Sequence, residues 1–307
     1  MFKDIVLAVT PSSICENAAE KAFSFASRFE SKLYLLHVCG MEQGWGAMEH
    51  LETSGVVDRI RENMKEYYKE RLCKMPNCEV IVVAGISHNE ILRVARKKNA
   101  DLIIMGPHTK EHAEKRSKMW GMAGSTLERV SQRARCPVMI VTRETPGNGD
   151  FKTIVAATDL SEQAGCAVAY AGQLARHYKA GLTVLNILES NKIYPSDIRD
   201  QIEKARNRLQ SEYGGRLEGL KDCSFECAVG DPPMEILDVA QKKNADLVIM
   251  AHHSKETDPE KAFLGSTVTK VALNCGCPTM SVNRHFDLRC GMMYDQTGQV
   301  VEVTSTV

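Results

Sequence analysis

The sequence has no net charge and no long apolar segment, and both deficits exclude classes of function. Lys and Arg together number 39 in 307 residues, and Asp and Glu also number 39. A neutral chain has no overall field that attracts a nucleic acid or an anionic membrane. No apolar run approaches the roughly 20 residues that span a bilayer, and the start of the chain (MFKD) has no features of a secretion signal. We therefore expect a soluble, cytoplasmic protein with no nucleic-acid or membrane partner.

The sequence also lacks the residue sets that indicate catalysis or metal binding. It contains no evident Ser/His/Asp group and no pair of carboxylates with the character of an active site. His252 and His253 are adjacent, and His108 and His112 lie four residues apart, but no Cys or carboxylate cluster accompanies either pair. We therefore predict no catalytic residues and no metal site.

Eleven cysteines are present, but their odd number and unequal spacing indicate thiols rather than a disulfide framework. Only Cys136 and Cys277 occupy equivalent places in the two halves of the chain, each before a proline and an apolar segment. We interpret both as core residues. The pairs Cys223-x3-Cys227 and Cys275-x-Cys277 each occur in one half only, and a redox role is not predicted for them.

What the sequence does contain is an internal repeat. Residues 2–9 (FKDIVLAV) are matched by residues 151–158 (FKTIVAAT), a shift of 149 positions (151 − 2). Residues 90–105 match residues 235–250 at 13 of 16 positions, a shift of 145 (235 − 90), and the block KKNADL is identical in both. A Gly-Ser-Thr motif also recurs, at a shift of 141 (265 − 124). The chain is therefore two copies of one domain, and the first copy has the longer loops.

The domain boundaries follow from the repeat and from one segment rich in turn formers. We place the first domain at residues 1–144, a linker (TPGNGD) at 145–150 and the second domain at 151–284. Residues 285–307 have no counterpart in the first copy. This tail contains two short apolar stretches around a turn-like segment, so a hairpin and a frayed end are both open.

Each copy alternates short apolar runs with helical periodicities. Near-continuous aliphatic runs, typical of strands buried on both faces, occur in the first copy at residues 5–9, 33–38, 80–83, 102–105 and 138–141. Apolar residues at spacings of three and four predict a first helix with one face on a sheet. The residues of this stripe in the two copies are Ala18, Ala22, Phe25, Ala26 and Phe29, and Ala167, Ala171, Leu174, Ala175 and Tyr178.

A second, longer helix is predicted in each copy from a further apolar side. Its residues are Ile60, Met64, Tyr67 and Leu72 in the first copy, and Ile198, Ile202, Ala205, Leu209 and Leu217 in the second. Alternating strands and helices predict an α/β fold in which each domain is a doubly wound parallel sheet with helices on both faces.

Candidate ligand sites follow from that architecture. In an open parallel sheet, ligands bind beyond the carboxyl ends of the strands, where the strand order reverses. The candidate segments are therefore those after the first and fourth strands of each copy. The Gly-Ser-Thr motif stands at the start of the last helix. Its N–H groups and hydroxyls could bind a phosphate; the alternative is that Ser or Thr only caps the helix. The motif residues are Gly124, Ser125 and Thr126, and Gly265, Ser266 and Thr267.

Taken together, these motifs resemble the signature of the universal stress protein family. The resemblance rests on ADL(I/V)IM, a loop, Gly-Ser-Thr, Cys-Pro and a last strand, in that order and in both copies. It implies two five-stranded parallel sheets, each of strand order 3-2-1-4-5, that pair through their last strands as an intramolecular pseudo-dimer. It also implies a stress-response protein in a family where some members bind ATP and others do not. A homodimer of two chains and an unidentified protein partner remain open.

In ATP-binding members, the resemblance implies an Asp after strand one and the pattern G-x2-G-x9-G-(S/T) after strand four. Copy one keeps Gly106, Gly124 and Ser125. It has Thr10 at the place of the Asp and Thr109 at the second glycine, with 14 residues (110–123) between Thr109 and Gly124. Copy one is therefore the weaker site or no site.

Copy two departs from the pattern in a complementary way. It keeps Asp159, Gly265 and Ser266, but has Ala251 and Ser254 at the two glycine positions. A side chain there hinders close approach of the backbone to a phosphate. In copy one, by contrast, Thr10 in place of the Asp removes a charge-assisted hydrogen bond worth roughly 1.5–3 kcal/mol. We expect copy two to hold adenosine better, with a compromised phosphate loop.

The sequence predicts a regulatory protein that binds an adenine nucleotide (ATP, ADP or AMP) without substantial catalysis. The second domain is the preferred site, and His253 at its rim is a further candidate contact. The alternative is a stress-linked interaction scaffold whose pockets have degenerated. A weak ATPase is a third hypothesis, for which the sequence offers no candidate base.

Overall fold

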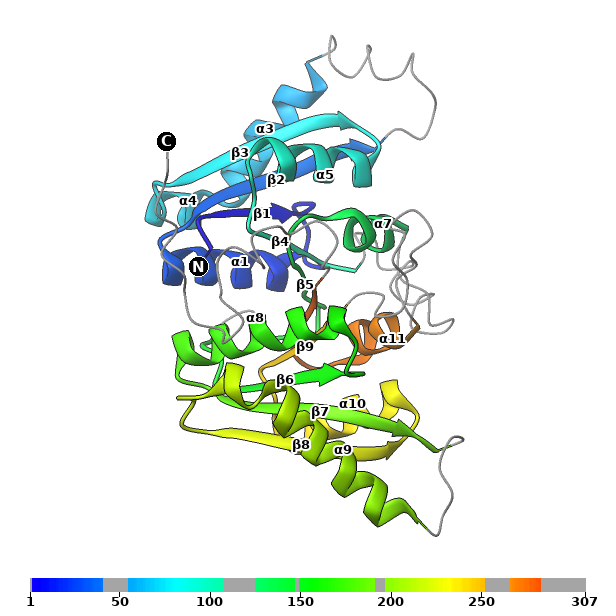
Figure 1. Cartoon of the computed structure of the whole chain (residues 1–307). Helices are drawn as coiled ribbons and strands as arrows, with labels where there is room; N and C mark the ends of the chain where they lie inside the picture. Colours follow the sequence, from blue (N-terminus) through cyan, green and yellow to red (C-terminus); the bar gives the residue numbers. More distant parts are fainter. Residues whose placement is uncertain are drawn as a thin grey trace, which may run out of the picture. The chain divides into compact units, whose positions relative to one another are not determined.

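The chain divides into two compact units, Met1–Gly149 and Asp150–Val307. The computed structural model describes residues 2–40, 55–107, 125–146, 149–190, 197–251 and 266–282. Each unit alternates strands and helices along the chain (Figure 1). None of the helices in these described ranges is long and apolar enough to cross a membrane.

The first unit is a parallel sheet of strand order β3-β2-β1-β4-β5. Ile5 of β1 pairs with Leu33 of β2 on one side and with Leu102 of β4 on the other. Its elements are β1 (Asp4–Ala8), α1 (Glu16–Phe29), β2 (Lys32–Gly40), α3 (Val56–Tyr67), α4 (Lys69–Lys74), β3 (Cys78–Gly85), α5 (Ser87–Lys97), β4 (Leu102–Met105), α7 (Ser125–Arg133) and β5 (Val138–Ile140).

The second unit repeats this arrangement, with strand order β8-β7-β6-β9-β10. Its elements are β6 (Thr153–Thr158), α8 (Glu162–Tyr178), β7 (Gly181–Glu189), α9 (Ile198–Tyr213), the 3-10 helix η3 (Gly215–Leu217), β8 (Cys223–Gly230), α10 (Pro232–Lys242), β9 (Leu247–Ala251), α11 (Ser266–Asn274) and β10 (Thr279–Val282). The predicted α/β class and the parallel order 3-2-1-4-5 are therefore confirmed in both units.

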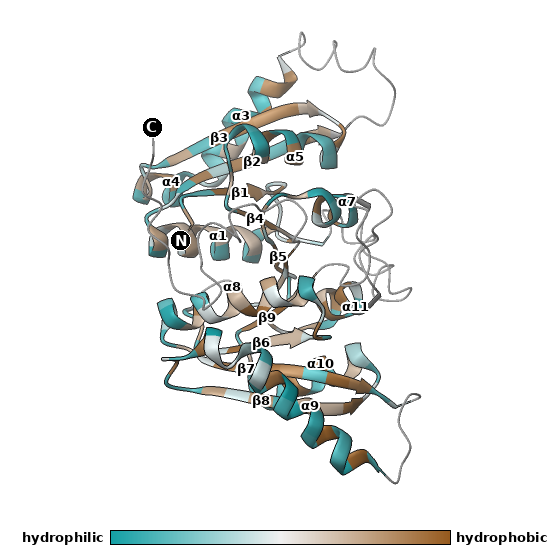
Figure 2. Ribbon diagram, viewed as in Figure 1, coloured by the Kyte–Doolittle hydropathy of each residue, from teal (hydrophilic) through white to brown (hydrophobic). Residues whose placement is uncertain are grey.

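The core of each unit lies on the central strands and on the stripe of the first helix. Ile5, Val6 and Leu7 of β1 are fully buried, as are Ile154 and Val155 of β6. The alanines predicted on the inner faces of α1 and α8 are buried as well. Hydrophobic residues run along the strands, whereas the helices carry both hydrophobic and hydrophilic residues (Figure 2). Strands buried on both faces account for the near-continuous apolar runs in the sequence.

The identical KKNADL block has a structural role in both units. Asp101 Oδ2 accepts hydrogen bonds from the backbone N–H groups of Lys3 and Asp4, at 2.8 and 3.1 Å. Asp246 repeats this clamp at the start of β6, at 2.8 and 2.9 Å. Asn99 adopts the left-handed conformation (φ +53°), which asparagine tolerates better than most residues. The block therefore fixes the amino ends of the central strands.

The prediction for the second helix of copy one was wrong in one respect. Tyr67 was placed on the apolar side, but its side chain is 49% exposed, whereas Tyr68 is 1% exposed. Residues three and four positions after Met64 are both compatible with one face of a helix, and the structure buries Tyr68, the fourth. The counterpart α9 is continuous, and its buried Tyr213 is equivalent to Tyr68 at the shift of 145 (213 − 68).

The chain is anchored to the first unit where the predicted linker begins. The Asn17 side chain in α1 donates hydrogen bonds to the carbonyl oxygens of Arg143 and Thr145, at 2.6 and 2.7 Å. Thr145 is fully buried, and its hydroxyl lies 2.8 Å from that of Thr142. The chain is thus already packed at Thr145. The tail, residues 285–307, lies outside the described residues.

Candidate functional site

The candidate site of the second unit lies at the carboxyl edge of its sheet, where the strand order reverses. Strand β6 pairs with β7 on one side and with β9 on the other. Ala157 of β6 is opposite Met250 of β9, so Thr158 and Asp159 come next to Ala251, the last residue of β9. Asp159 therefore stands at the position where the topology places a ligand.

Thr158 fixes the start of the loop after β6. Its hydroxyl oxygen accepts a hydrogen bond from the Leu160 N–H at 3.0 Å and lies 3.0 Å from the Tyr213 hydroxyl. Its carbonyl oxygen accepts a 2.8 Å bond from the Asn186 side chain. Because Thr158, Tyr213 and Asn186 are all buried, these bonds are shielded from water and hold the loop in one place.

The loop itself is closed by its own side chains. Asp159 is exposed, and its Oδ1 accepts a 3.0 Å hydrogen bond from the backbone N–H of Ser161. Ser161 in turn caps α8, because its hydroxyl oxygen accepts a 3.2 Å bond from the Ala164 N–H. Between them, Leu160 has φ +63°, a left-handed conformation that costs a non-glycine residue about 1–2 kcal/mol. The surrounding bonds therefore hold the Asp159 carboxylate on a strained but well-supported turn.

The equivalent loop of the first unit has a different conformation. At the shift of 149, the residues equivalent to 158–161 are Val9, Thr10, Pro11 and Ser12. Proline is locked near φ −65°, so Pro11 cannot adopt the φ +63° of Leu160. Ser12 does not cap α1, because this helix begins only at Glu16 and its N-cap residue is Cys15. The first unit therefore lacks both the carboxylate and the turn that would hold it.

Two further differences lie beneath that loop. Among the described residues, the buried Tyr68 hydroxyl has no hydrogen-bond partner, because Val9 stands where Thr158 meets Tyr213 in the second unit. Burial raises the pKa of the Tyr68 hydroxyl above its ordinary value. His37 occupies the place of Asn186, and its Nδ1 bonds to the Val9 carbonyl oxygen at 2.9 Å. The first unit has the same backbone frame at this place, with fewer polar side-chain contacts within the described ranges.

Between the fourth strand of each unit, β4 or β9, and the next helix, the structure describes only residues 106 and 107. Gly106 follows β4 and is buried, whereas Ala251 is the last residue of β9 and is in register with Val282 of β10. Ser125 and Ser266 are the first residues of α7 and α11, at the places predicted for them.

Thr267 is half-buried in the first turn of α11. The remaining predicted site residues lie outside the described residues: Gly124, His253, Ser254 and Gly265. The structure therefore describes the Asp159 loop in full and the predicted phosphate segment only at its helix starts.

Both sequence and fold have known relatives. Comparison with protein families matches residues 1–142 and 150–283 to the universal stress protein family. The chain belongs to the universal stress protein family. The two matched segments cover both copies, so this universal stress protein is a tandem member of a stress-response group.

Individual relatives agree with this assignment. Universal stress protein MJ0531 of Methanocaldococcus jannaschii is 30% identical over 151 residues, which cover 47% of this chain and 84% of that protein. Universal stress protein YxiE of Bacillus subtilis is 29% identical over 156 residues, 46% of this chain and 99% of that protein. Among solved structures, a universal stress protein from Archaeoglobus fulgidus aligns with a TM-score of 0.66 and 18% identity, over 92% of this chain and 96% of that one. This last similarity shows the fold.

Sequence reasoning singled out Asp159 in this universal stress protein but missed the residues that hold it. Thr158, Asn186 and Tyr213 lie on three different elements, and no motif joins them. A signal was nevertheless present in the repeat, since Thr158 aligns with Val9 and Tyr213 with Tyr68. The second copy pairs a buried tyrosine with threonine, and the first copy pairs it with valine. This difference indicates a polar contact that is present in the second copy.

Proposed function

We propose that this universal stress protein is a stress-response regulator that binds an adenine nucleotide (ATP, ADP or AMP) in its second domain, without substantial catalysis. The observation that supports this most is the turn at residues 158–161. It holds an exposed carboxylate at the strand-order reversal, supported by buried hydrogen bonds from β7 and α9.

The chemistry of Asp159 suits the ribose of a nucleotide. An ionised carboxylate accepts up to about four hydrogen bonds, and ribose hydroxyl groups are donors of the kind that it accepts alongside the Ser161 N–H. Such charge-assisted bonds are roughly twice as strong as neutral ones. The first turn of α11, with Ser266 and Thr267, supplies N–H groups suited to a phosphate. These contacts bind and orient a ligand, in line with a sensor or store of nucleotide.

The test is isothermal titration of the full chain with ATP, ADP and AMP. Asp159→Asn keeps an oxygen that can accept the Ser161 N–H, and it removes only the charge. We expect Asp159→Asn to weaken nucleotide binding about tenfold, and Asp159→Ala to weaken it further because the turn loses its acceptor as well.

Thr10→Ala, at the equivalent position of the first domain, is the matched control and should leave the affinity unchanged. A wild-type protein that binds none of the three nucleotides up to millimolar concentration would contradict the proposal. So would an affinity that responds to Thr10→Ala and ignores Asp159→Asn.

A second candidate function is favoured by the first domain, namely an interaction scaffold with a degenerate pocket. Pro11 excludes the turn conformation seen at Leu160, and Thr10 has no carboxylate. If both domains act only as an interaction scaffold, crystals grown with ATP should contain no bound nucleotide. Nucleotide found in the second domain of such a crystal would refute the scaffold hypothesis for that domain.

A further inference from the structure

The second unit contains a cavity of about 510 Å³ that is separate from the Asp159 edge. The residues that line it lie on α10, on the turn after α10, and on the turn between α11 and β10; they are Leu237, Ala240, Gln241, Asn244, Ala245, Asn274, Cys275, Gly276 and Cys277. The two turns precede the parallel strands β9 and β10. The cavity is therefore at the amino edge of the sheet, whereas Asp159 is at the carboxyl edge. Its volume is in the range of small-molecule sites.

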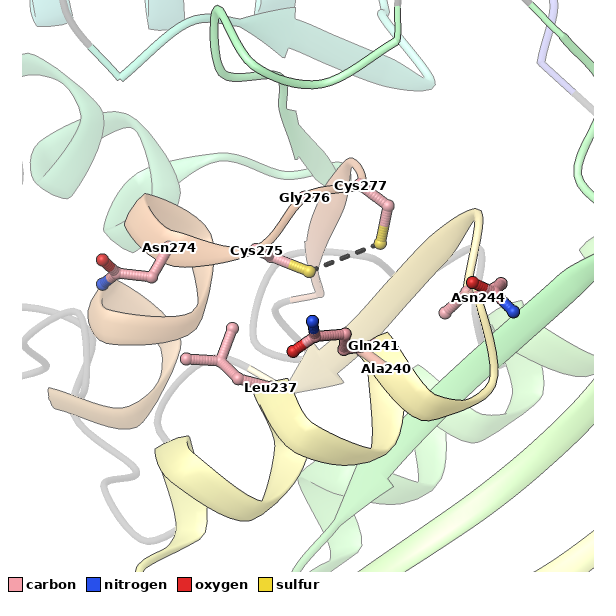
Figure 3. Close-up of a pocket in the computed structure, with 9 residues that line it drawn as sticks. Leu237, Ala240, Gln241, Asn244, Asn274, Cys275, Gly276 and Cys277 are labelled. Carbon is pink, nitrogen blue, oxygen red and sulfur yellow. Dashed lines mark hydrogen bonds between the residues drawn. The ribbon is translucent and has the colours of Figure 1, made fainter.

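Two thiols face each other in the wall of this cavity. The sulfur atoms of Cys275 and Cys277 are 3.3 Å apart and share a hydrogen bond (Figure 3). Both residues are buried, with 4% and 8% of their surface exposed. A disulfide needs a sulfur–sulfur distance of about 2.05 Å, so a movement of about 1.3 Å closes the bond. Gly276 lies between them, and the space where its side chain would be is open, so the turn has room for that movement.

The hydrogen bond also makes the two thiols chemically different. Donation from the Cys277 thiol stabilises the Cys275 thiolate and lowers the pKa of Cys275 to about 7. The same interaction, together with burial, raises the pKa of Cys277. The thiolate is the form that attacks a disulfide, and the best attacking thiol has a pKa near the ambient pH. Cys275 therefore has the character of an attacking thiol and Cys277 that of a resolving thiol.

The first unit shows that the fold does not require the second thiol. At the shift of 141, Ala134 stands at the place of Cys275, and Cys136 at that of Cys277. The helix ends are alike: the Ala134 N–H bonds to the Val130 carbonyl oxygen at 2.8 Å, and the Cys275 N–H bonds to that of Val271 at 2.8 Å. Alanine thus satisfies this position structurally. Cys275 adds a chemical group rather than a packing requirement.

We propose that Cys275 and Cys277 form a redox-active dithiol that exchanges with a low-molecular-weight disulfide in the adjoining cavity. The Cys275 thiolate attacks one sulfur of that disulfide, its S–S bond breaks, and one thiolate leaves and takes up a proton. Cys277 then loses its proton and attacks the Cys275 sulfur of the mixed disulfide, which expels the second thiol. The two cysteines lose two electrons and two protons, and the small disulfide is reduced to two thiols.

The experiment is a redox titration of the native full chain in buffers of reduced glutathione and glutathione disulfide. After an acid quench and alkylation with iodoacetamide, trypsin releases residues 271–284, which contain Cys275 and Cys277 and no other cysteine. As the buffer becomes oxidising, we expect this peptide to take up no carbamidomethyl group and to be about 2 Da lighter than the unalkylated dithiol peptide, because two hydrogens are lost. Cys136 should remain alkylated, since Ala134 offers it no second thiol.

Cys275→Ala is the matched control, because Ala134 carries the same helix end in the first unit. This variant should keep the wild-type melting temperature and lose the 2 Da change. A wild-type peptide that keeps two alkylatable thiols in oxidising buffer, or that retains glutathione without closing the internal bond, would overturn the proposal.

A second readout separates a reactive pair from two packed thiols. The rate of Cys275 alkylation should rise with pH around a midpoint near 7, and Cys277→Ala should move that midpoint upward by removing the hydrogen-bond donor. An unshifted midpoint in Cys277→Ala would rule out the proposed division of roles.

Discussion

At the residue scale, Val9 and Thr158 occupy equivalent positions, but only Thr158 forms a hydrogen bond with the buried tyrosine next to it. Thr158 pairs with the Tyr213 hydroxyl and with the Leu160 N–H. Val9 offers neither interaction, and the buried Tyr68 hydroxyl has no hydrogen-bond partner within the part of the chain that the structure describes. Valine and threonine have similar shapes, so the two domains differ here in hydrogen bonding more than in packing. A buried unsatisfied polar group costs about 1–3 kcal/mol.

This difference predicts the effects of two exchanges. Thr158→Val should lower the free energy of unfolding by about 1–3 kcal/mol, because it leaves the Tyr213 hydroxyl and the Leu160 N–H without their partner. Val9→Thr should raise that free energy by up to about 1.5 kcal/mol, because it supplies the partner that Tyr68 lacks. Urea denaturation followed by circular dichroism measures both. Equal effects of the two exchanges would show that the hydroxyl contact is not the cause.

At the element scale, the first helices of the two domains begin differently. Helix α8 begins at Glu162 directly after its cap Ser161, whereas α1 begins at Glu16, four residues after the equivalent Ser12. The helix ends agree, since Glu30 and Lys179 both adopt the left-handed capping conformation. The first turn of the helix is therefore where the domains diverge, and it is adjacent to the candidate ligand edge.

The cap of α8 gives a prediction at this scale. Ser161→Ala removes the bond to the Ala164 N–H and should lower the free energy of unfolding by about 1 kcal/mol. Ser12→Ala is the matched control and should cost less, because the Ser12 hydroxyl caps no helix: α1 begins four residues later, at Glu16. Thermal denaturation of the two variants compares them directly. A larger loss in Ser12→Ala would contradict the assignment of Ser161 as the working cap.

At the scale of the whole molecule, the two domains share one strand order but carry different side chains at the candidate site. Each sheet, taken by itself, has its fifth strand at one end of the order: β5 in the first unit and β10 in the second. An edge strand presents backbone groups that a partner strand can satisfy. The sequence predicts that these two strands pair within the chain, and that pairing stays a prediction.

Separate expression of the two halves tests whether β5 and β10 pair. If the terminal strands carry the pairing, residues 1–149 and 150–307 should associate with each other or each with itself, as measured by light scattering after size-exclusion chromatography. Halves that are folded by circular dichroism and remain monomeric when mixed would argue against such pairing. The full chain measured alongside reports whether two chains associate further.

Much of the fold could be predicted because its signals are local. Apolar runs and spacings of three and four predicted strands and helices, and the repeat predicted two units with the same order. The error at Tyr67 arose because positions three and four after Met64 are both compatible with one face of a helix. Packing against the sheet decides between Tyr67 and Tyr68, and the structure buries Tyr68.

The sequence by itself determined the family, the duplicated α/β frame and the position of Asp159, because each depends on short motifs in a fixed order. The tertiary structure decided how Asp159 is supported, through a hydroxyl pair 55 residues apart and an amide contact 28 residues apart. It also decided that Cys275 and Cys277 face each other beside a cavity, although their spacing alone did not favour a redox role. The physical reason is common to both. Hydrogen bonds between side chains depend on how helices and strands pack, and that packing places groups together that sequence spacing does not relate.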